Sequence, residues 1–198
     1  WFEPDFEMSG VRFERPGMRL SQLEDTLRVL DRDLRGHGAP LNPPPLQRPR
    51  PPLHVGGRGD RLLEVVARSA DGWNTVWTLE QEVYRDRLSS LERACEKADR
   101  DPATVERSVG LYTLVGESEA DLVRRFQLLV EASPRGVLAG QTLDDWRSGH
   151  LVGTVDQVAE QLDSWRTLGV SRVILGLSAV PFAGVDVADL DLAASLIR

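Results

Sequence analysis

Short apolar segments alternate with amphipathic helical segments over most of the chain, and this alternation restricts the possible folds more than any other feature. Four segments have the β-branched and aromatic content of single strands: 53–55, 71–77, 108–116 and 171–179. A helical segment separates each strand from the next. Strands that are joined through helices pair in parallel, by right-handed crossovers. The chain is therefore predicted to be an α/β protein with a parallel sheet, built as a single domain over residues 1–198.

The helical segments are recognised by leucine and other apolar residues at spacings of three and four. The first is predicted to begin near Leu20, with Ser21 and Glu24 as a capping box at its start. Two later pairs match the same capping pattern, Thr78 with Gln81 and Thr154 with Gln157. The remaining helices are predicted at 60–69, 118–132 and 185–197, with a short one at about 144–148.

Two architectures satisfy this order of strands and helices. One is a doubly wound sheet, for which four strands are few, and the other is a (β/α)8 barrel, for which four strands are half. A complete barrel usually takes about 250 residues, whereas this chain has 198. The pattern alone leaves both open.

Composition excludes several kinds of partner. A net charge of −7 disfavours binding to nucleic acid phosphates, and no apolar run is long enough to cross a membrane. The single Cys95 excludes an intrachain disulfide and suits a reducing cytoplasm. Three scattered histidines and one cysteine predict no metal site.

A glycine-rich junction in the stretch HVGGRGD is the most informative local motif. Gly56, Gly57 and Gly59 follow the first predicted strand and precede a helix, the position where α/β proteins bind ligands. Glycine lets the backbone approach a ligand, and the first amides of a helix attract anions. Arg58 adds a positive charge, so the motif predicts a phosphate site. The structural alternative is a tight turn with Asp60 as the helix cap.

A wider stretch around this junction, PPPLQRPRPPLHVGGRGDRLLEVVARSADGWN, resembles the central signature of luciferase-like monooxygenases. These are flavin- and deazaflavin-dependent oxidoreductases with a (β/α)8 barrel. The segments WFEPDFEMSGVRFERPGMRLSQLEDTLRVL and LVGTVDQVAEQLDSWRTLGVSRVILGL are similar to flanking parts of that family. The resemblance implies a partial TIM barrel: strands five to eight with their helices, and the preceding helix. It also implies an N-terminally truncated chain, with Trp1 just after the fourth strand.

The resemblance also implies a function. GGRG and ADGWN look most like members that use coenzyme F420, which transfer a hydride between the deazaflavin and a small organic substrate. The alternatives are an FMN-dependent monooxygenase and a non-catalytic cofactor-binding or assembly fragment. In the family mode Gly56, Gly57, Arg58 and Gly59 hold the cofactor phosphate. A small-molecule substrate, no nucleic acid or membrane, and a homodimer of the full-length protein are expected.

Other residues receive more limited roles. Trp1 and Trp77 are candidate substrate-binding residues, because both lie near the carboxyl end of the predicted barrel; core packing is the alternative for Trp77. Asp71 and Gly72 are predicted to form a structural turn at the opposite end. His54 is expected to be a hydrogen-bonded core histidine and His150 a loop residue. The sequence assigns no catalytic acid or base.

Overall fold

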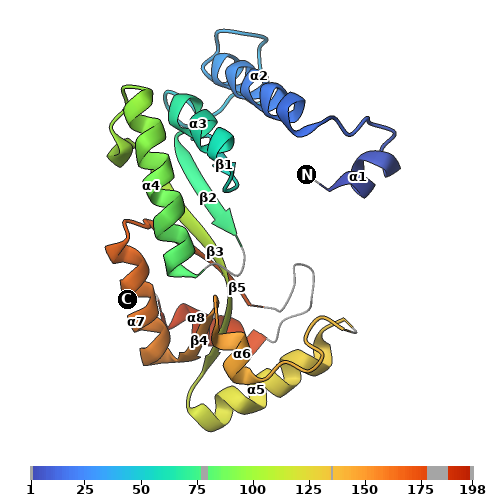
Figure 1. Ribbon diagram of the computed structural model, residues 1–198, viewed down its shortest axis with the longest axis vertical. Helices are drawn as coiled ribbons and strands as arrows, with labels where there is room; N and C mark the ends of the chain where they lie inside the picture. The colour runs from blue at the N-terminus through green and yellow to red at the C-terminus, as the bar shows by residue number, and fades with distance from the viewer. Residues whose placement is uncertain (1, 77–79, 135, 178–186, 197–198) are drawn as a thin grey trace.

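The computed structural model describes residues 2–76, 80–134, 136–177 and 187–196 of the 198-residue chain. Figure 1 shows the order of its helices and strands. The two candidate substrate-binding tryptophans, Trp1 and Trp77, lie outside the described residues, as does the predicted helix cap Thr78.

A five-stranded parallel sheet forms the centre of the protein. The long β3 pairs with β2 through residues 106–110 along one edge and with β5 through residues 108–112 along the other. Its residues 113–116 pair with β4. Near its amino end the sheet therefore has the order β1-β2-β3-β5, which are the four predicted strands. The strands are β1 (His54–Gly56), β2 (Gly72–Val76), β3 (Glu106–Gly116), β4 (Leu151–Thr154) and β5 (Arg172–Gly176).

The predicted α/β class with parallel pairing is confirmed, and the strand count is corrected from four to five. The sequence predicts no strand at β4, because the four residues LVGT are too few to show a strand period.

The helices follow the predicted order, with differences at their starts. The helix expected from Leu20 begins at Pro16, whose fixed φ suits the first helical turn. The proposed Ser21–Glu24 cap is wrong, because the Ser21 hydroxyl donates to the Gly17 carbonyl inside the helix. The helices are α1 (Glu3–Met8), α2 (Pro16–Leu34), α3 (Asp60–Ser69), α4 (Gln81–Lys97), α5 (Glu119–Ala132), α6 (Leu143–Arg147), α7 (Val155–Thr167) and α8 (Val187–Ala194), with a 3-10 turn at Pro102–Thr104.

The later capping predictions have different outcomes. At the start of α7, the predicted box is confirmed: the Thr154 amide donates to Gln157 Oε1 at 2.8 Å, and the Gln157 amide donates to Thr154 Oγ1 at 3.5 Å. At the start of α4, Glu80 occupies the N-cap and Gln81 is the first helical residue, so Gln81 does not stand three residues after the cap.

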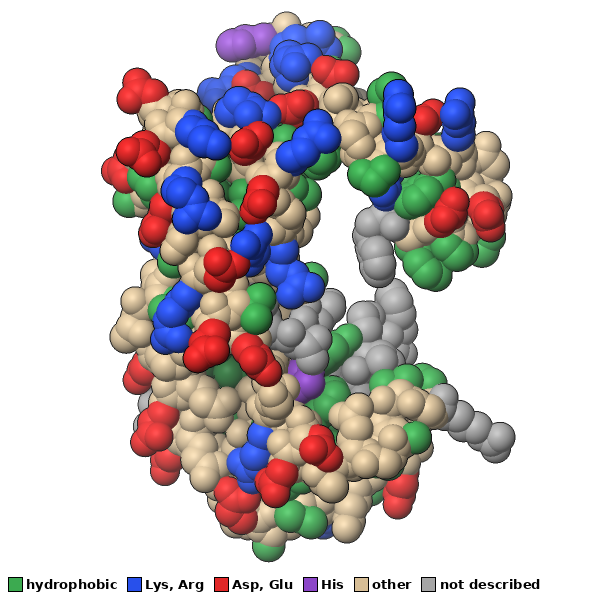
Figure 2. All heavy atoms as spheres, viewed as in Figure 1, with side chains coloured by type: hydrophobic (Ala, Val, Ile, Leu, Met, Phe, Trp, Pro, Cys, Tyr) green, Lys and Arg blue, Asp and Glu red, His purple; other side chains and the backbone are tan. Residues whose placement is uncertain are grey.

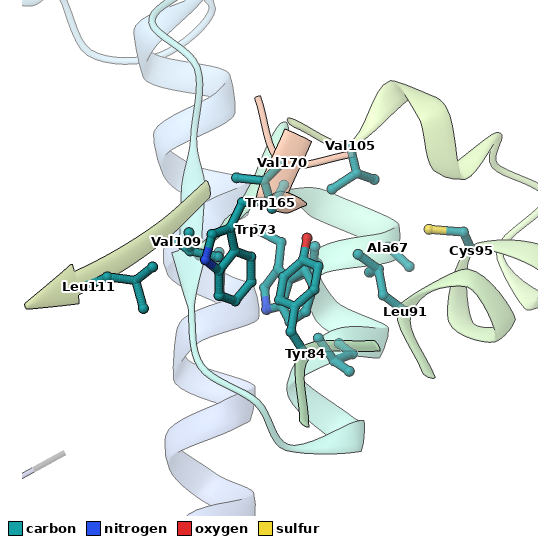
Figure 3. Close-up of a cluster of buried hydrophobic side chains, with 14 of the residues drawn as sticks. Ala67, Trp73, Tyr84, Leu91, Cys95, Val105, Val109, Leu111, Trp165 and Val170 are labelled. Carbon is teal, nitrogen blue, oxygen red and sulfur yellow. The ribbon is translucent and has the colours of Figure 1, made fainter. Parts of the chain in front are cut away.

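One face of the sheet, here called the outer face, is covered by helices and forms the core. Its side chains Val55, Trp73, Val109 and Leu111 are almost fully buried. The Trp73 ring stacks on Tyr84 of α4 at a centroid distance of 5.4 Å (Figure 3). Tyr84 in turn meets the edge of Trp165 of α7 at 5.3 Å. Aromatic stacking and burial therefore fix α4 and α7 against the strands.

The opposite face, here called the inner face, is much less covered. It contains four ionisable residues, an Asn74–Ser108 hydrogen bond and two exposed apolar side chains, Val76 and Ile174, which are 38% and 44% exposed. Figure 2 shows the molecule hollowed between the region of α1 and α2 and the region of α5 and α6. By strand register the inner face comprises His54, Gly56, Gly72, Asn74, Val76, Glu106, Ser108, Gly110, Tyr112, Arg172, Ile174 and Gly176.

His54 is part of this inner face, and the prediction of a hydrogen-bonded core histidine is wrong. Its ring is half-buried, and Nε2 lies 3.4 Å from Glu106 Oε2 without forming a hydrogen bond. The ring crosses β2 at Gly72, where a Cβ atom would lie 2.3 Å from His54 Nδ1. Gly72 therefore lets a side chain of β1 reach a carboxylate of β3, which Arg172 of β5 also contacts at 2.8 Å.

We expect Gly72→Ala to lower the free energy of unfolding by about 1–3 kcal/mol, because the new methyl group displaces the His54 ring. The measurement is urea denaturation. The double variant Gly72→Ala/His54→Ala should lose less than the sum of the two single changes, since the clash is then absent. Gly59→Ala is the control, because no described residue lies within 4 Å of its Cβ position. Additive effects of the two changes would contradict this account.

Candidate functional site

The glycine loop, Gly56 to Gly59, lies where the sequence predicted it. Gly56 ends β1, and Gly59 is the N-cap of α3, so the loop joins the carboxyl end of a strand to the amino end of a helix. The Gly57 amide donates to the Asn74 carbonyl at 3.1 Å, which continues the pairing of β1 with β2. The remainder of the loop then turns into the helix.

Four consecutive amides at this turn remain available to a ligand. The N–H groups of Arg58, Gly59, Asp60 and Arg61 donate to no acceptor among the described residues, whereas the next two amides both donate to the Gly59 carbonyl. Free amides at a helix start carry partial positive charge, which the helix dipole adds to. The loop thus has the donors that a phosphate requires.

The three glycines differ in whether the fold itself requires glycine at that position. Gly57 has a φ of +140°, and a Cβ atom there would lie 3.0 Å from Leu62 Cδ1. It therefore needs to be glycine for the conformation of the loop itself. Gly59 has a φ of −72° and open space at its Cβ position, and a Cβ on Gly56 would make only ordinary contact with Asn74. A bare backbone at these two positions leaves room for a ligand.

Charges around the loop favour an anion. The Arg58 side chain is exposed and forms no ion pair or hydrogen bond with the described residues. The one carboxylate of the loop region, on Asp60, accepts a 2.7 Å hydrogen bond from Arg87 of α4. Arg87 also contacts Asp86 and the Arg58 carbonyl, the latter at 3.5 Å. Pairing with Arg87 offsets the repulsion that Asp60 would exert on a phosphate, and this contribution of α4 was not predicted from the sequence.

Trp73 connects the loop to the core. Its indole Nε1 donates to the Gly57 carbonyl at 2.7 Å, while its ring is fully buried beside Tyr84. The sequence indicated that the stretch ADGWN follows the loop, but not that its tryptophan holds the loop in place.

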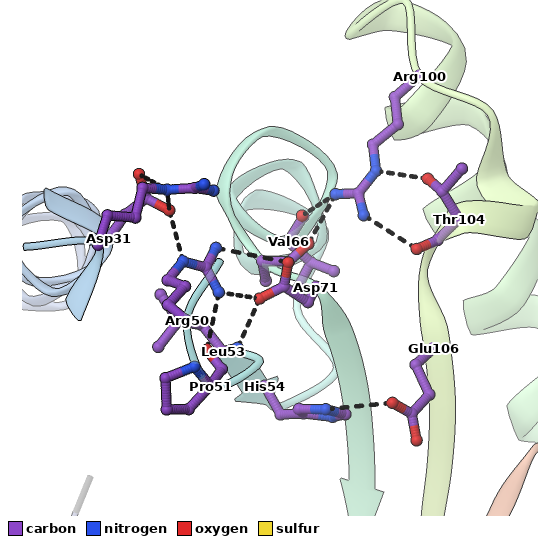
Figure 4. Close-up of polar contacts among 12 residues, drawn as sticks. Asp31, Arg50, Pro51, Leu53, His54, Val66, Asp71, Arg100, Thr104 and Glu106 are labelled. Carbon is purple, nitrogen blue, oxygen red and sulfur yellow. Dashed lines mark hydrogen bonds and ion pairs between the residues drawn. The ribbon is translucent and has the colours of Figure 1, made fainter. Parts of the chain in front are cut away.

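Asp71 lies at the opposite, amino end of the strands and has a structural role, as predicted. Its carboxylate accepts hydrogen bonds from Arg50 Nη1 at 2.5 Å and from the Leu53 amide at 2.6 Å (Figure 4). The Arg50 side chain is only 7% exposed and also donates to Asp31 of α2 at 2.6 Å. One buried guanidinium therefore joins α2, the entry to β1 and the entry to β2.

The hydrogen bonds of Asp71 lower the pKa of its carboxyl group. Burial by itself would raise the pKa of this carboxyl group, but the hydrogen bonds from Arg50 and the Leu53 amide outweigh it, so the pKa lies below its ordinary value of 3.8. The folded state therefore favours the ionised carboxylate.

His150 lies in the loop between α6 and β4, as expected. Its Nδ1 atom is 2.6 Å from the Trp146 carbonyl, and its ring stacks on Trp146 at 4.0 Å. Burial lowers the pKa of His150, which favours the neutral ring. These contacts explain the residue through local packing.

The part of the chain that the structure describes contains neither a metal-binding cluster nor a membrane-spanning helix. No group of three or more His, Cys, Asp or Glu side chains there is arranged to hold a metal ion. No helix there has both the length and the apolar character needed to cross a membrane.

Comparison with known proteins decides the family. The sequence profile of luciferase-like monooxygenases matches residues 1–172. The chain belongs to the luciferase-like monooxygenase family. It is 22% identical to a phthiodiolone/phenolphthiodiolone dimycocerosates ketoreductase of Mycobacterium tuberculosis, in a match that covers 85% of this chain and 57% of the ketoreductase. The chain thus spans little more than half the length of this curated relative.

Solved structures agree on the fold. An F420-dependent secondary alcohol dehydrogenase in complex with an F420–acetone adduct superposes with a TM-score of 0.64 at 14% identity, over 90% of this chain and 61% of that one. A monooxygenase from Streptomyces bottropensis superposes with a TM-score of 0.69 at 18% identity, over 100% of this chain and 63% of that one. The chain therefore has the fold of TIM-barrel luciferase-like proteins.

We expect Asp71→Asn to lower the free energy of unfolding at pH 7 by about 1–2 kcal/mol, because the buried Arg50 loses one of its two charged partners. The side chain of Asp71 is 42% exposed, which limits the loss. The folded pKa is lowered, so the contribution of Asp71 is present above 3.8 and disappears as the pH falls below it.

Urea denaturation at pH 7 and at pH values below 3.8 measures this difference. The wild type and Asp71→Asn should converge in acid. Asp144→Asn is the matched control, because the Asp144 side chain is 94% exposed, and it should change little. A gap between wild type and Asp71→Asn that stays constant with pH would contradict the assigned role.

Proposed function

We propose that this protein is an F420-dependent oxidoreductase, in which Gly56, Gly57, Arg58 and Gly59 hold a phosphate of the cofactor. The observation that supports this most directly is the row of free amides from Arg58 to Arg61 at the start of α3. Family membership supports the enzyme class, since luciferase-like proteins are oxidoreductases and monooxygenases.

The residues of this chain would act by binding and orientation. The amides and the Arg58 guanidinium would neutralise the phosphate, and Trp73 would keep the loop in register with the sheet. When bound, the deazaflavin supplies a ring carbon that accepts or donates a hydride.

The names of two similar proteins favour F420 over FMN as the cofactor. The curated relative is a ketoreductase, and one superposed structure is an alcohol dehydrogenase bound to an F420–acetone adduct. Both names describe the interconversion of carbonyl and hydroxyl groups, which hydride transfer accomplishes. We therefore propose a small organic carbonyl compound or alcohol as the substrate.

FMN is the second candidate, because other superposed structures are monooxygenases, including an EDTA monooxygenase from Chelativorans with a TM-score of 0.64 at 14% identity. FMN also carries a phosphate, so the glycine loop suits both cofactors. Separate titrations of the protein with F420 and with FMN, followed by cofactor fluorescence, compare the two affinities directly.

Gly59→Asp tests the phosphate site most cleanly. A Cβ at this position meets no atom of the described part of the chain within 4 Å, and aspartate is a favourable N-cap, so the fold should be unchanged. The added carboxylate would repel the phosphate, and we expect F420 to bind at least about tenfold more weakly, a loss of about 1.4 kcal/mol.

Gly59→Asn is the matched control, since it has the same shape without the charge and should bind nearly as the wild type does. Fluorescence titration with F420 gives both dissociation constants. Equal affinities for the Asp and Asn variants would remove the phosphate from this loop. Gly57→Asp is a poorer test, because its Cβ would press on Leu62 at 3.0 Å and disturb the loop itself.

A further inference from the structure

The glycine loop carries an acidic side chain although its proposed ligand is an anion. Asp60 is the first residue of α3, and its amide is one of the four free donors. Its side chain is 76% exposed, and Gly59 rather than Asp60 is the N-cap. An acidic residue in the first turn stabilises a helix through the helix dipole. The same carboxylate also repels any anion that the free amides bind.

Arg87 of α4 offsets only part of this negative charge, because it is shared between two carboxylates. Its Nη1 atom donates to Asp60 Oδ1 at 2.7 Å, and its Nε atom donates to Asp86 Oδ2 at 2.9 Å. These three side chains together carry one net negative charge. The exposed Arg58, which forms no ion pair with the described residues, brings the sum of the four side chains to zero.

The positive charge that remains at the loop is that of the helix start, which is equivalent to about half an elementary charge. Arg61, the next cation along α3, has its guanidinium beside the start of α2, where a Cβ atom on Gly17 would lie 3.5 Å from Arg61 Nη1. Arg61 therefore belongs to the contact between α2 and α3. The loop thus has donors for the oxygens of a phosphate but little net positive charge.

The phosphates of the two candidate cofactors differ in charge. The phosphate of F420 is a diester and has one negative charge. The phosphate of FMN is a monoester, which loses its second proton with a pKa of about 6 and approaches two negative charges above neutral pH. Coulombic repulsion is proportional to the charge of the ligand, so a nearby carboxylate repels the monoester about twice as strongly as the diester.

We propose that Asp60 is a specificity determinant of the glycine loop, which favours a singly charged phosphodiester over a doubly charged phosphomonoester. The inference rests on the proposed function, since the loop has to hold a phosphate. It gives a physical reason within this chain for F420 rather than FMN. Arg87 is then a positioning residue, because its pairing with Asp60 sets how strongly that carboxylate acts on the ligand.

Three flavins that differ only at the phosphate isolate the effect of charge. Riboflavin has no phosphate, FMN has a monoester, and the monomethyl ester of FMN has a diester. Quenching of flavin fluorescence gives the Kd of each at about pH 8, where FMN is doubly charged, and at about pH 5, where it is singly charged. Because the ring is the same, the ratio of the Kd values of FMN and its methyl ester reports on the second charge.

At about pH 8, Asp60→Asn should strengthen the binding of FMN about fivefold more than that of the methyl ester, the effect of one unit charge at about 4 Å in water. At about pH 5 the two ligands should gain equally. Arg87→Gln should weaken FMN more than the methyl ester, since Asp60 then acts without its partner. The double variant Asp60→Asn/Arg87→Gln should return the ratio toward that of the wild type.

Asp163→Asn is the matched control. Asp163 of α7 is 69% exposed and accepts a 2.5 Å contact from Arg166, so it resembles the pair of Asp60 and Arg87 in exposure and partner. The control should leave the ratio of the two Kd values unchanged at both pH values. Circular dichroism verifies that each variant is folded.

The outcomes separate this inference from the proposed function. If FMN and its methyl ester bind no more tightly than riboflavin, in the wild type and in Asp60→Asn, the loop holds no phosphate and both proposals fail. If both phosphorylated flavins bind more tightly than riboflavin but Asp60→Asn changes them equally at about pH 8, the phosphate site stands and the role of Asp60 is overturned. A change in ratio that is the same at about pH 5 would also overturn it, because charge would not be the cause.

Discussion

The hydrogen bond from the Trp73 indole to the Gly57 carbonyl joins the packing of this protein to its candidate site. The ring of Trp73 is enclosed by the core, so its Nε1 atom has a fixed position. The 2.7 Å hydrogen bond from Trp73 therefore holds the Gly57 carbonyl in place, in a loop where Gly57 has a φ of +140°. A loop of bare backbone has little intrinsic stiffness. Its amides can form a defined anion site only because a neighbouring strand fixes them.

The two ends of α3 differ in whether their backbone groups have hydrogen-bond partners. At its carboxyl end, Arg100 donates to the carbonyls of Val66, Ala67 and Ala70, at 3.2, 3.1 and 2.7 Å. Three carbonyls at this end therefore accept hydrogen bonds from one arginine of the protein. At its amino end, the first amides have no such partners among the residues that the structure describes. The amino ends of the strands are likewise joined by Arg50 and its two carboxylates, so rigid contacts gather opposite the open donors.

How far the sequence predicted this arrangement depends on the range of the interactions. Strand order and parallel direction follow from local patterns and connectivity, and the place of the glycine loop follows from them. The sequence did not predict β4, because its four residues are too few to show a strand period. It placed the start of α2 too late, because the leucine repeat of this helix begins after Pro16. The contacts of Arg50 and Arg87 join residues about 20 to 30 positions apart. No local pattern encodes such contacts, so only the folded chain shows which carboxylates these arginines neutralise.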